Sequence, residues 1–536
     1  MTVTRAAAVP DLRLLPPVLA GWMATRFGLT HAPATTFGAS ATIAAIGVAA
    51  LCSPSAKPAS RAKAYTIPLA TTLLVAAALA TSAALHLYAL HLGPVAQLAA
   101  THSKATVTAT VTGDPKPVKG IILLPVQIDE LSTPENAPAH RLHVHSRATI
   151  LADPYEPEDA ARWTALLPSM HIELTARFIP PKDPADGDAA TLTATQPPHV
   201  IGAPDLLQQL AGALRADLHH AVADLPTEPA GVLPALTLGD TSAVPAQTTA
   251  DLKTAGLAYL VVVSGENLVF LSAAVLPLAR FAGLRARALA VFAAALALGF
   301  TALARPGPPM VRATVTALLA STALATGRRF RGLTATAGAA LILMLVDPWL
   351  AHQYGFVLSI AATAGLLISA PGWRDRLCLL HRVPRWIATS AAYTAAAEVY
   401  CEPLLVTFTG ALPIYSVAAN VLAVPAAPSA TVLGVAAMAG YVLWPPAGHA
   451  AAWLAQWPTR WICLVAHGVA SVPGASLPWP TGLTGMFALL AAYAIGRRVS
   501  RDLQKLRERH AAESPLLDPP VSTPTHPHRS QPWSPQ

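Results

Sequence analysis

The chain has 536 residues, of which 53% are hydrophobic and 12% are charged, and its formal net charge is +8. In soluble domains about a quarter of all residues are charged. The composition therefore excludes a water-soluble enzyme or binding module for most of the chain. The four cysteines form no CxxC pair and predict neither a disulfide framework nor a zinc site.

Apolar runs that cross, or nearly cross, a hydrocarbon core of about 30 Å recur along the chain, interrupted by one long polar stretch. They lie near residues 14–30, 37–53, 66–92, 257–279, 288–304, 310–327, 332–347, 356–371, 387–410, 416–442, 451–470 and 483–496. The pattern predicts a mainly α, polytopic helical membrane protein with about 10 to 12 transmembrane helices.

Lysine and arginine lie mainly in every second loop between the apolar runs, and the intervening loops are acidic or uncharged. The basic groups lie near the N-terminus and near residues 57–63, 280–287, 328–331, 374–385 and 497–509. Because cytoplasmic loops carry the basic excess, this bias predicts a multi-pass protein with both termini in the cytoplasm. We interpret the net positive charge as a mark of membrane topology rather than of nucleic-acid affinity.

Residues 97–204 change from continuous apolar runs to a period-two alternation, which is typical of half-buried strands. The alternation is clear at residues 105–113, 141–150, 171–179 and 191–195. Short strands separated by Pro, Gly and Asp predict a small β-barrel, and we expect the OB type. The charge bias places this barrel outside the cytoplasmic membrane.

Residues 205–225 have the apolar spacing of an amphipathic helix, with Leu206, Leu210, Leu214 and Leu218 along one face. We expect this helix to rest on the bilayer surface or on the barrel, with His219 and His220 as surface residues. From about Ala511 the chain is rich in Pro, Ser and His, which predicts disorder.

These changes of pattern predict five parts. They are N-terminal transmembrane helices (1–96), the extracellular β domain (97–204), the amphipathic helix and connection (205–231), the main transmembrane domain (232–496), and a basic cytoplasmic segment with a disordered tail (497–536).

Polar side chains within the apolar runs mark the candidate functional site, because a central Arg or Asp costs about 2.5 to 3.5 kcal/mol in lipid. They are Ser264, Glu266, Asn267, Arg312, Glu398, Glu402 and Asn420. Gly265 and Pro403 lie beside such groups, where a helix can break and line a water-filled path. We expect Glu266 and Glu402 to pair with Arg312 or to face a polar cavity. The alternative is that these groups lie near helix ends, where interfacial water satisfies them.

Other polar motifs carry less weight. His143 and His145 could ligate a metal, but in an alternating strand they simply share the polar face. Ser264 before Gly265 could be an intramembrane protease serine, yet no histidine-bearing helix offers a base. The chain has no GxxxxGK[ST] segment, which argues against a built-in ATPase. We therefore predict no metal, cofactor or catalytic residue, and do not expect an enzyme.

The segment VLPALTLGDTSAVPAQTTADLKTAGLAYLVVVSGENLVF at residues 232–270 resembles the signature of the ComEC family of competence channels. That family has a GD(T/R)S segment before a GL(T/S)HLLAVSG(A/L)N helix start. Three further stretches follow in the family's order. They are RPGPPMVRATVTALLASTALATGRR, DPWLAHQYGFVLSIAATAGL and FTGALPIYSVAANVLAVPAAPSATVLG. With DLRLLPPVLAGW near the N-terminus, the resemblance covers roughly residues 11 to 496.

The resemblance implies a channel component that passes single-stranded DNA across the bacterial cytoplasmic membrane during natural transformation. Channel or substrate-path candidates matched to the family or stranded in apolar runs are Asp240, Ser264, Gly265, Glu266, Asn267, Arg312, Glu398, Glu402 and Asn420. Matched positions interpreted as structural are Gly239, Ser242, Gly256, Asp347, Pro348, Gly355, Phe356, Ser359 and Pro425. We interpret Asp240 and Asp347 as structural or interfacial as well, because a carboxylate is a poor phosphate partner.

The sequence departs from the family pattern at Tyr259, where the family has histidine, and at Val357, where it has glutamine. Many family members also continue into a metallo-β-lactamase-like domain with an HxHxDH motif, which we do not find here. The resemblance therefore implies a separate nuclease. Other implied partners are single-stranded DNA, the phospholipid bilayer, a membrane-anchored DNA-binding competence protein, a cytoplasmic helicase and further copies of the chain.

Two other functions stay open because a fold does not fix a function. One is a small-molecule or lipid transporter on the same membrane scaffold, without DNA transport. The other, weaker one is an intramembrane hydrolase that uses Ser264.

Overall fold

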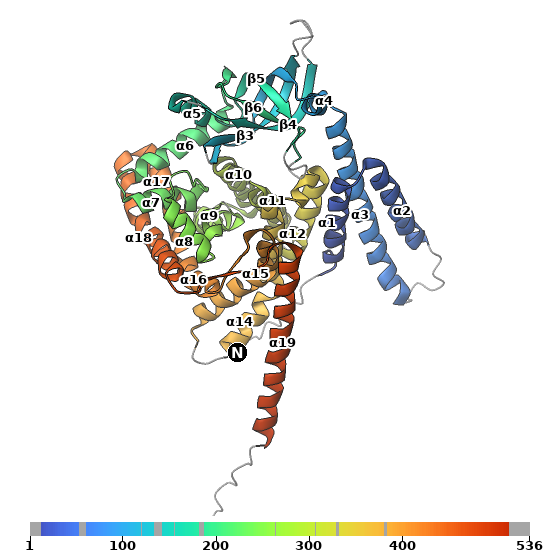
Figure 1. The fold of residues 1–536 in the computed structure, drawn as a ribbon. Coiled ribbons are helices and arrows are strands. Elements are labelled where there is room, and N and C mark those ends of the chain that lie inside the picture. The colour runs from blue at the N-terminus through green and yellow to red at the C-terminus, as the bar shows by residue number, and fades with distance from the viewer. Residues whose placement is uncertain are drawn as a thin grey trace, which may run out of the picture.

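The computed structural model describes residues 12–52, 61–118, 120–132, 142–154, 156–181, 187–262, 264–305, 307–328, 332–379 and 383–513. Figure 1 shows a β domain above a group of helices, with the N-terminal helices at one side and a long helix projecting from the end opposite the β domain. The chain is mainly α-helical, as the apolar runs predict.

The N-terminal unit consists of helices in which α3 packs against both α1 and α2. Its elements are α1 (Leu15–Thr30), α2 (Pro33–Cys52), α3 (Arg61–Leu92) and α4 (Pro94–Ala100). A Cβ on Gly28 would lie 2.9 Å from the Cβ of Ala83, and one on Gly21 would lie 2.5 Å from Leu79. Glycine at these crossings therefore lets the helices approach closely, as small residues do in membranes.

The β domain follows α4 and contains a closed barrel. Its elements are β1 (Lys104–Val111), β2 (Lys116–Val118), β3 (Ile121–Ser132), β4 (Leu142–Ala152), α5 (Pro157–Thr164), β5 (His171–Ile179), β6 (Ala190–Ala194) and β7 (His199–Gly202). The strands run in the order β1-β3-β4-β6-β5, and β5 pairs again with β1. Five strands therefore close on themselves, with β4 and β6 parallel and the other pairs in the ring antiparallel.

Alternate residues of these strands fill the barrel, and Trp163 of α5 joins the same core with no exposed surface. The four predicted alternating segments are confirmed as β1, β4, β5 and β6. We did not predict β2, β3 or β7. The start of β3 reads IILLPV, a continuous apolar run with Pro125 inside it, which hides the period of two.

After the barrel, α6 lies between the β domain and the helices α17 and α18 (Figure 1). The next elements are α6 (Leu206–Val222), α7 (Thr227–Leu238), α8 (Ala246–Thr254), the 3-10 turn η2 (Ala258–Val261) and α9 (Gly265–Phe281). The predicted helix is confirmed as α6, and the leucines along its face differ in burial. Leu206 and Leu210 are 77% and 62% exposed, whereas Leu218 is buried in the core, because only the second half of α6 meets the membrane helices.

The remaining helices complete the membrane part. They are α10 (Ala286–Ala304), α11 (Pro308–Thr326), α12 (Gly332–Val346), η3 (Pro348–Ala351), α13 (Tyr354–Ile368), α14 (Ala370–Cys378), α15 (Arg385–Thr409), α16 (Ser416–Ala423), η4 (Val424–Ala426), α17 (Ala427–Leu443), α18 (Pro445–Ala470) and α19 (Gly482–Glu513). A short antiparallel pair, β8 (Ala411–Pro413) and β9 (Ser476–Pro478), joins the loop after α15 to the loop before α19.

Within the described residues, four helical stretches are long and apolar enough to span a membrane. They are Pro33–Cys52, Thr66–Leu92, Ala286–Ala304 and Ser416–Leu443, and the bent pair α13 and α14, with a 43° bend, would make a fifth. Large apolar side chains lie exposed on such helices, including Val291 at 71%, as lipid-facing surfaces require. A total of 10 to 12 spans stays a prediction.

The C-terminal prediction needs one correction. Helix α19 continues to Glu513, so residues 511–513, which we expected to be disordered, are helical. The helix-forming run of Arg, Gln, Leu, Lys and Glu before them explains the extension. The rest of the predicted tail, residues 514–536, lies outside the described residues.

Candidate functional site

Three separate elements of the membrane part bring their polar side chains into one hydrogen-bonded chain. The Tyr259 hydroxyl of η2 donates to Oδ1 of Asn420 at 2.6 Å, and Nδ2 of Asn420 in α16 donates to Oε1 of Glu398 in α15 at 3.2 Å. Nδ2 of Asn420 also donates to the Ser416 carbonyl at 2.9 Å. The polar residues Glu398 and Asn420, predicted separately, therefore meet, and Tyr259 links them to the segment that precedes α9.

Glu402 lies one helical turn after Glu398 on α15, so the two carboxyl groups share a face of that helix. Glu402 is 8% exposed, and its Oε2 has no hydrogen-bond partner among the described residues. A buried carboxyl oxygen without a donor is costly. The contacts among the described residues thus leave one carboxyl oxygen of this group unsatisfied.

Ser264 and Glu266 lie at the beginning of α9. Ser264 is the N-cap residue, and its Oγ accepts a hydrogen bond from the Glu266 main-chain N–H at 3.2 Å. A serine oxygen in this position stabilises the first turn of a helix. In the described part of the chain no histidine is hydrogen-bonded to this hydroxyl.

Arg312 lies on α11 and is 6% exposed. Its Nε donates to the Ser359 hydroxyl of α13 at 2.9 Å, and this bond joins two family-motif positions. Gly265 packs beside it, because a Cβ there would lie 2.5 Å from Ala313 and 3.9 Å from Nη2 of Arg312. Among the described residues the arginine thus binds a serine between α11 and α13, and no ion pair joins it to Glu266 or Glu402. The other expectation, that these glutamates face a polar cavity, stays a prediction.

Asn267 is enclosed between helices. It is 5% exposed, and its Nδ2 donates to the Leu236 carbonyl of α7 at 3.1 Å. The Thr431 hydroxyl of α17 donates to the same carbonyl at 3.3 Å. Two side chains thus satisfy one main-chain oxygen near the end of α7. This arrangement positions α7 against α9 and α17 rather than leaving the Asn267 amide open to a path.

Asp240 lies just after α7 and accepts four hydrogen bonds. Its Oδ1 accepts from the main-chain N–H and the hydroxyl of Ser242 at 3.1 and 2.6 Å. Its Oδ2 binds Nη2 of Arg215 at 3.1 Å and Nε2 of His219 at 3.0 Å. Burial alone raises the pKa of Asp240, but the bonds from His219 and Ser242 and the charge of Arg215 together lower that pKa below its usual value.

The same arginine connects α6 with the β domain. Nη2 of Arg215 lies 3.9 Å from Asp114 in the barrel loop after β1, and Asp114 also pairs with Arg305 at the end of α10. A second connection joins Arg147 of β4 to Asp347 after α12, with Nη1 and Oδ2 2.9 Å apart. The two acidic family-motif positions, Asp240 and Asp347, therefore lie at the junction between the barrel and the membrane helices.

Residues 236–499 match the family model described as Competence protein. This part of the chain belongs to the competence protein family. The match covers the segment from the end of α7 to the basic start of the projecting part of α19, and it includes the Tyr259–Asn420–Glu398 chain. No curated protein and no solved structure matches the chain.

The other family-motif positions lie at turns and helix contacts of this competence domain. Gly239 ends α7 with φ 71°, and Gly256 has φ 72°, where a Cβ would lie 2.5 Å from the Cβ of Ser416. Gly355 packs on Pro309, and Phe356 beside it has no exposed surface. Pro348 and Pro425 lie in the 3-10 turns η3 and η4, at the starts of α13 and α17.

Sequence reasoning missed several polar partners in the competence domain and beside it. His219 was predicted as a surface residue, and its side chain is 38% exposed, but its bond to Asp240 was not predicted. Its spacing of four from Arg215 on α6 is the signal that was available. His467 of α18 binds Asp251 through Nδ1 and Glu228 through Nε2, both at 2.6 Å. These groups are far apart in sequence, so no local pattern could connect them. His143 and His145 both lie exposed on β4, and among the described residues no group of three or more His, Cys, Asp or Glu side chains is arranged to hold a metal ion.

Proposed function

We propose that this chain is a channel component that passes single-stranded DNA across the bacterial cytoplasmic membrane. Membership of the competence family implies a role in DNA uptake during competence. The finer statement, that one strand crosses the bilayer through this domain, is our proposal. It requires no enzymatic step and no cofactor.

The observation that supports it is the polar chain of Tyr259, Asn420 and Glu398 with Glu402 beside it, among otherwise apolar helices. Polar and ionisable groups in a membrane interior are costly and usually face a bundle interior or a water-filled cavity. Here η2 and α16 are short elements of four and eight residues, and α15 is a long helix with Pro403 inside it. Short or interrupted helices can place main-chain groups along a transport path. We propose that the DNA strand passes along the side of these helices toward which the polar side chains point.

The β-barrel also supports the proposal that a single DNA strand is the substrate. A closed five-stranded barrel in which β5 returns to β1 fits the Greek-key description of the OB fold, a fold that binds single strands through its surface. We propose that it is an OB-type domain on the outer face, and that the chain has both termini in the cytoplasm. The two ion-pair connections through Asp114 and Arg147 would hold it over the membrane helices.

The partners follow from the proposed reaction. A strand that arrives alone needs a nuclease to remove its complement and a helicase to draw it inward. A membrane-anchored DNA-binding competence protein would deliver the duplex, and further copies of the chain could complete the conduit. All of these are proposals that rest on the family.

The test is a deletion strain supplied with labelled DNA, with DNA bound at the surface and DNA protected in the cytoplasm measured separately. We expect surface binding to persist and cytoplasmic label to disappear. Complementation with the full chain should restore uptake. Normal cytoplasmic arrival in the deletion strain would refute the channel function.

One observation favours the alternative of a small-molecule or lipid transporter on the same scaffold. Glu398 and Glu402 are both carboxylic acids, and Glu266 lies at the start of α9. Acidic groups repel a polyanion and suit a cation or a proton-coupled substrate. If the deletion strain imports DNA normally but loses uptake of a cationic solute, this second function replaces the first.

A further inference from the structure

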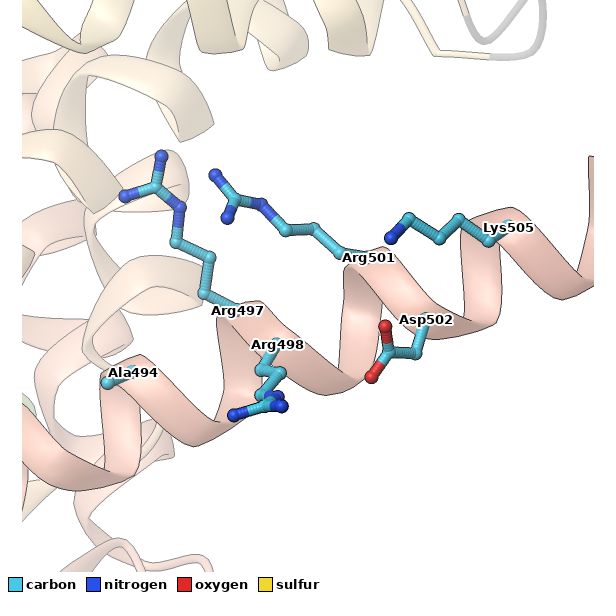
Figure 2. A pocket seen from close by; sticks show the side chains of 6 residues that line it. All are labelled: Ala494, Arg497, Arg498, Arg501, Asp502 and Lys505. Carbon is cyan, nitrogen blue, oxygen red and sulfur yellow. The ribbon is translucent and has the colours of Figure 1, made fainter.

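The second half of α19 leaves the body of the protein as a straight, exposed helix (Figure 1). Arg497, Arg501 and Lys505 follow one another at intervals of four residues along it and are all exposed. Figure 2 shows the three basic side chains extending from the same side of the helix, while Arg498 and Asp502 extend from another side. We call Arg497, Arg501 and Lys505 the basic ladder.

The ladder has a definite geometry. Four residues of α-helix rise about 6 Å, so its three cations are spaced about 6 Å apart over about 12 Å of axis. The space beside them is open, and the described residues that line it, Arg498 and Asp502 included, all belong to α19. The only acidic side chain in that lining, Asp502, lies off the ladder side (Figure 2). A polyanion lying along the axis would thus meet one cation at each helical turn.

Membrane lipid is the other polyanionic surface nearby, and the direction of the helix argues against it. The segment of α19 before Gly496 is apolar, and the same straight helix carries the ladder onward. The headgroup layer on each side of a bilayer is about 5 to 8 Å thick. A layer that crosses the helix axis can therefore cover one or two steps of the ladder, whereas an extended chain parallel to the axis can meet all three.

We infer that the basic ladder of α19 binds the phosphate backbone of a single nucleic-acid strand as it emerges on the cytoplasmic side. This inference rests on the proposed function and adds an exit site to it. The contacts are with the backbone alone, since the ladder offers no aromatic side chain for stacking. Binding is therefore sequence-independent and strongly dependent on salt.

The test uses the full chain in nanodiscs of zwitterionic lipid, so that no anionic lipid competes, and a fluorescent oligothymidylate as the probe. Anisotropy gives the dissociation constant over a range of salt concentrations. The ladder variant is Arg497→Gln/Arg501→Gln/Lys505→Gln. The matched control is Arg280→Gln/Arg285→Gln/Arg287→Gln, which removes the same charge from exposed arginines at the turn between α9 and α10.

Each phosphate contact with a single strand contributes about 0.7 to the slope of log K against log salt. Losing three contacts should therefore reduce the slope by about 2 in the ladder variant and leave it unchanged in the control. An unchanged slope in the ladder variant, or an equal loss in both variants, overturns the inference. So does a ladder variant that binds the probe normally but loses a lipid-dependent stabilisation seen in anionic nanodiscs, because the ladder would then be a membrane contact.

The uptake assay separates this inference from the proposed function. If deleting the whole chain leaves uptake normal, the channel function is wrong. If deletion abolishes uptake while the ladder variant both imports and binds DNA normally, only the exit site is wrong. The expected result is loss of uptake on deletion and a marked reduction in the ladder variant, with the control variant near the wild type.

Discussion

Replacing Asp240 by asparagine tests whether the acidic family-motif position is a structural anchor. The substitution keeps the shape of the side chain and allows its Oδ1 to accept both bonds from Ser242. The NH2 group, however, would face Nη2 of Arg215 and Nε2 of His219, which are both donors when the imidazole bonds the carboxylate. The charge-assisted bond from Arg215 is therefore lost, and His219 can keep only a neutral bond, in the tautomer whose Nε2 accepts from the new NH2 group.

The magnitude follows from the burial of the partners. The side chains of Asp240 and Arg215 are 15% and 13% exposed, so their bond is only partly screened and is worth about 1.5 to 3 kcal/mol. The bond from His219 adds less, because that side chain is 38% exposed. Arg215 keeps its bond to the Leu303 carbonyl at 3.3 Å. We expect a loss of about 2 to 3 kcal/mol in the local stability of the junction between α6 and α7.

Hydrogen exchange of the detergent-solubilised chain measures this local stability. Each 1.4 kcal/mol is a tenfold change in an equilibrium constant, so protection in α6 and in residues 239–244 should fall roughly thirty- to a hundredfold. The barrel strands should keep their protection. Ser242→Ala, which removes one neutral donor, is the matched control and should cost about 1 kcal/mol. Equal protection in Asp240→Asn and the wild type would show that this carboxylate does not hold the junction.

The same anchor predicts a dependence on pH. The pKa of Asp240 is lowered in the folded chain from its ordinary value of 3.8. A carboxylate with a lowered pKa contributes stability that is fully present above the unfolded value and is lost as pH falls through the folded value. In the wild type, protection of α6 should therefore decline as pH falls below about 4, whereas Asp240→Asn should remove this part of the decline.

The remaining predictions test packing, the polar chain and the second barrel contact. Gly434→Val should prevent folding, because a Cβ there would lie 2.1 Å from the Thr237 hydroxyl of α7. Gly468→Val is the control, because a Cβ at that position meets open space. Gel filtration should show a monodisperse peak for the control and none for Gly434→Val, and a monodisperse Gly434→Val would contradict the packing argument. Asn420→Leu should reduce DNA uptake at least tenfold while surface binding persists, and normal uptake would remove Asn420 from the path. A double-mutant cycle on Arg147 and Asp347 should give a coupling below about 1 kcal/mol, because Arg147 is 53% exposed; a coupling of several kcal/mol would contradict this screening argument.

Local patterns predicted much of the architecture. Continuous apolar runs indicated membrane helices, and a period of two indicated four of the five barrel strands, because one side of each strand is buried and the other is not. The strand β3 escaped prediction since its apolar residues run on without alternation and include Pro125. The ordered family motifs pointed to the competence family because they record local requirements, such as a left-handed turn at Gly239.

The polar site was predictable only as a set of candidates. The cost of burying Glu398, Glu402, Arg312 and Asn420 could be read from the sequence. Their partners could not, because charge complementarity suggested Arg312 with a glutamate, and the helices instead placed it beside Ser359. Pairing across elements depends on which helix faces meet.

The amino-acid sequence by itself thus indicated a membrane protein with a β-barrel, and it indicated which polar residues are costly to bury in a bilayer. Each of these follows from hydrophobic periodicity and local backbone chemistry. Only the tertiary structure decided that Tyr259, Asn420 and Glu398 form one chain, that Asp347 binds Arg147 of the barrel, and that Asp240 binds Arg215. The physical reason is that such contacts join residues up to 200 positions apart, and their geometry is set by helix packing rather than by any neighbouring sequence.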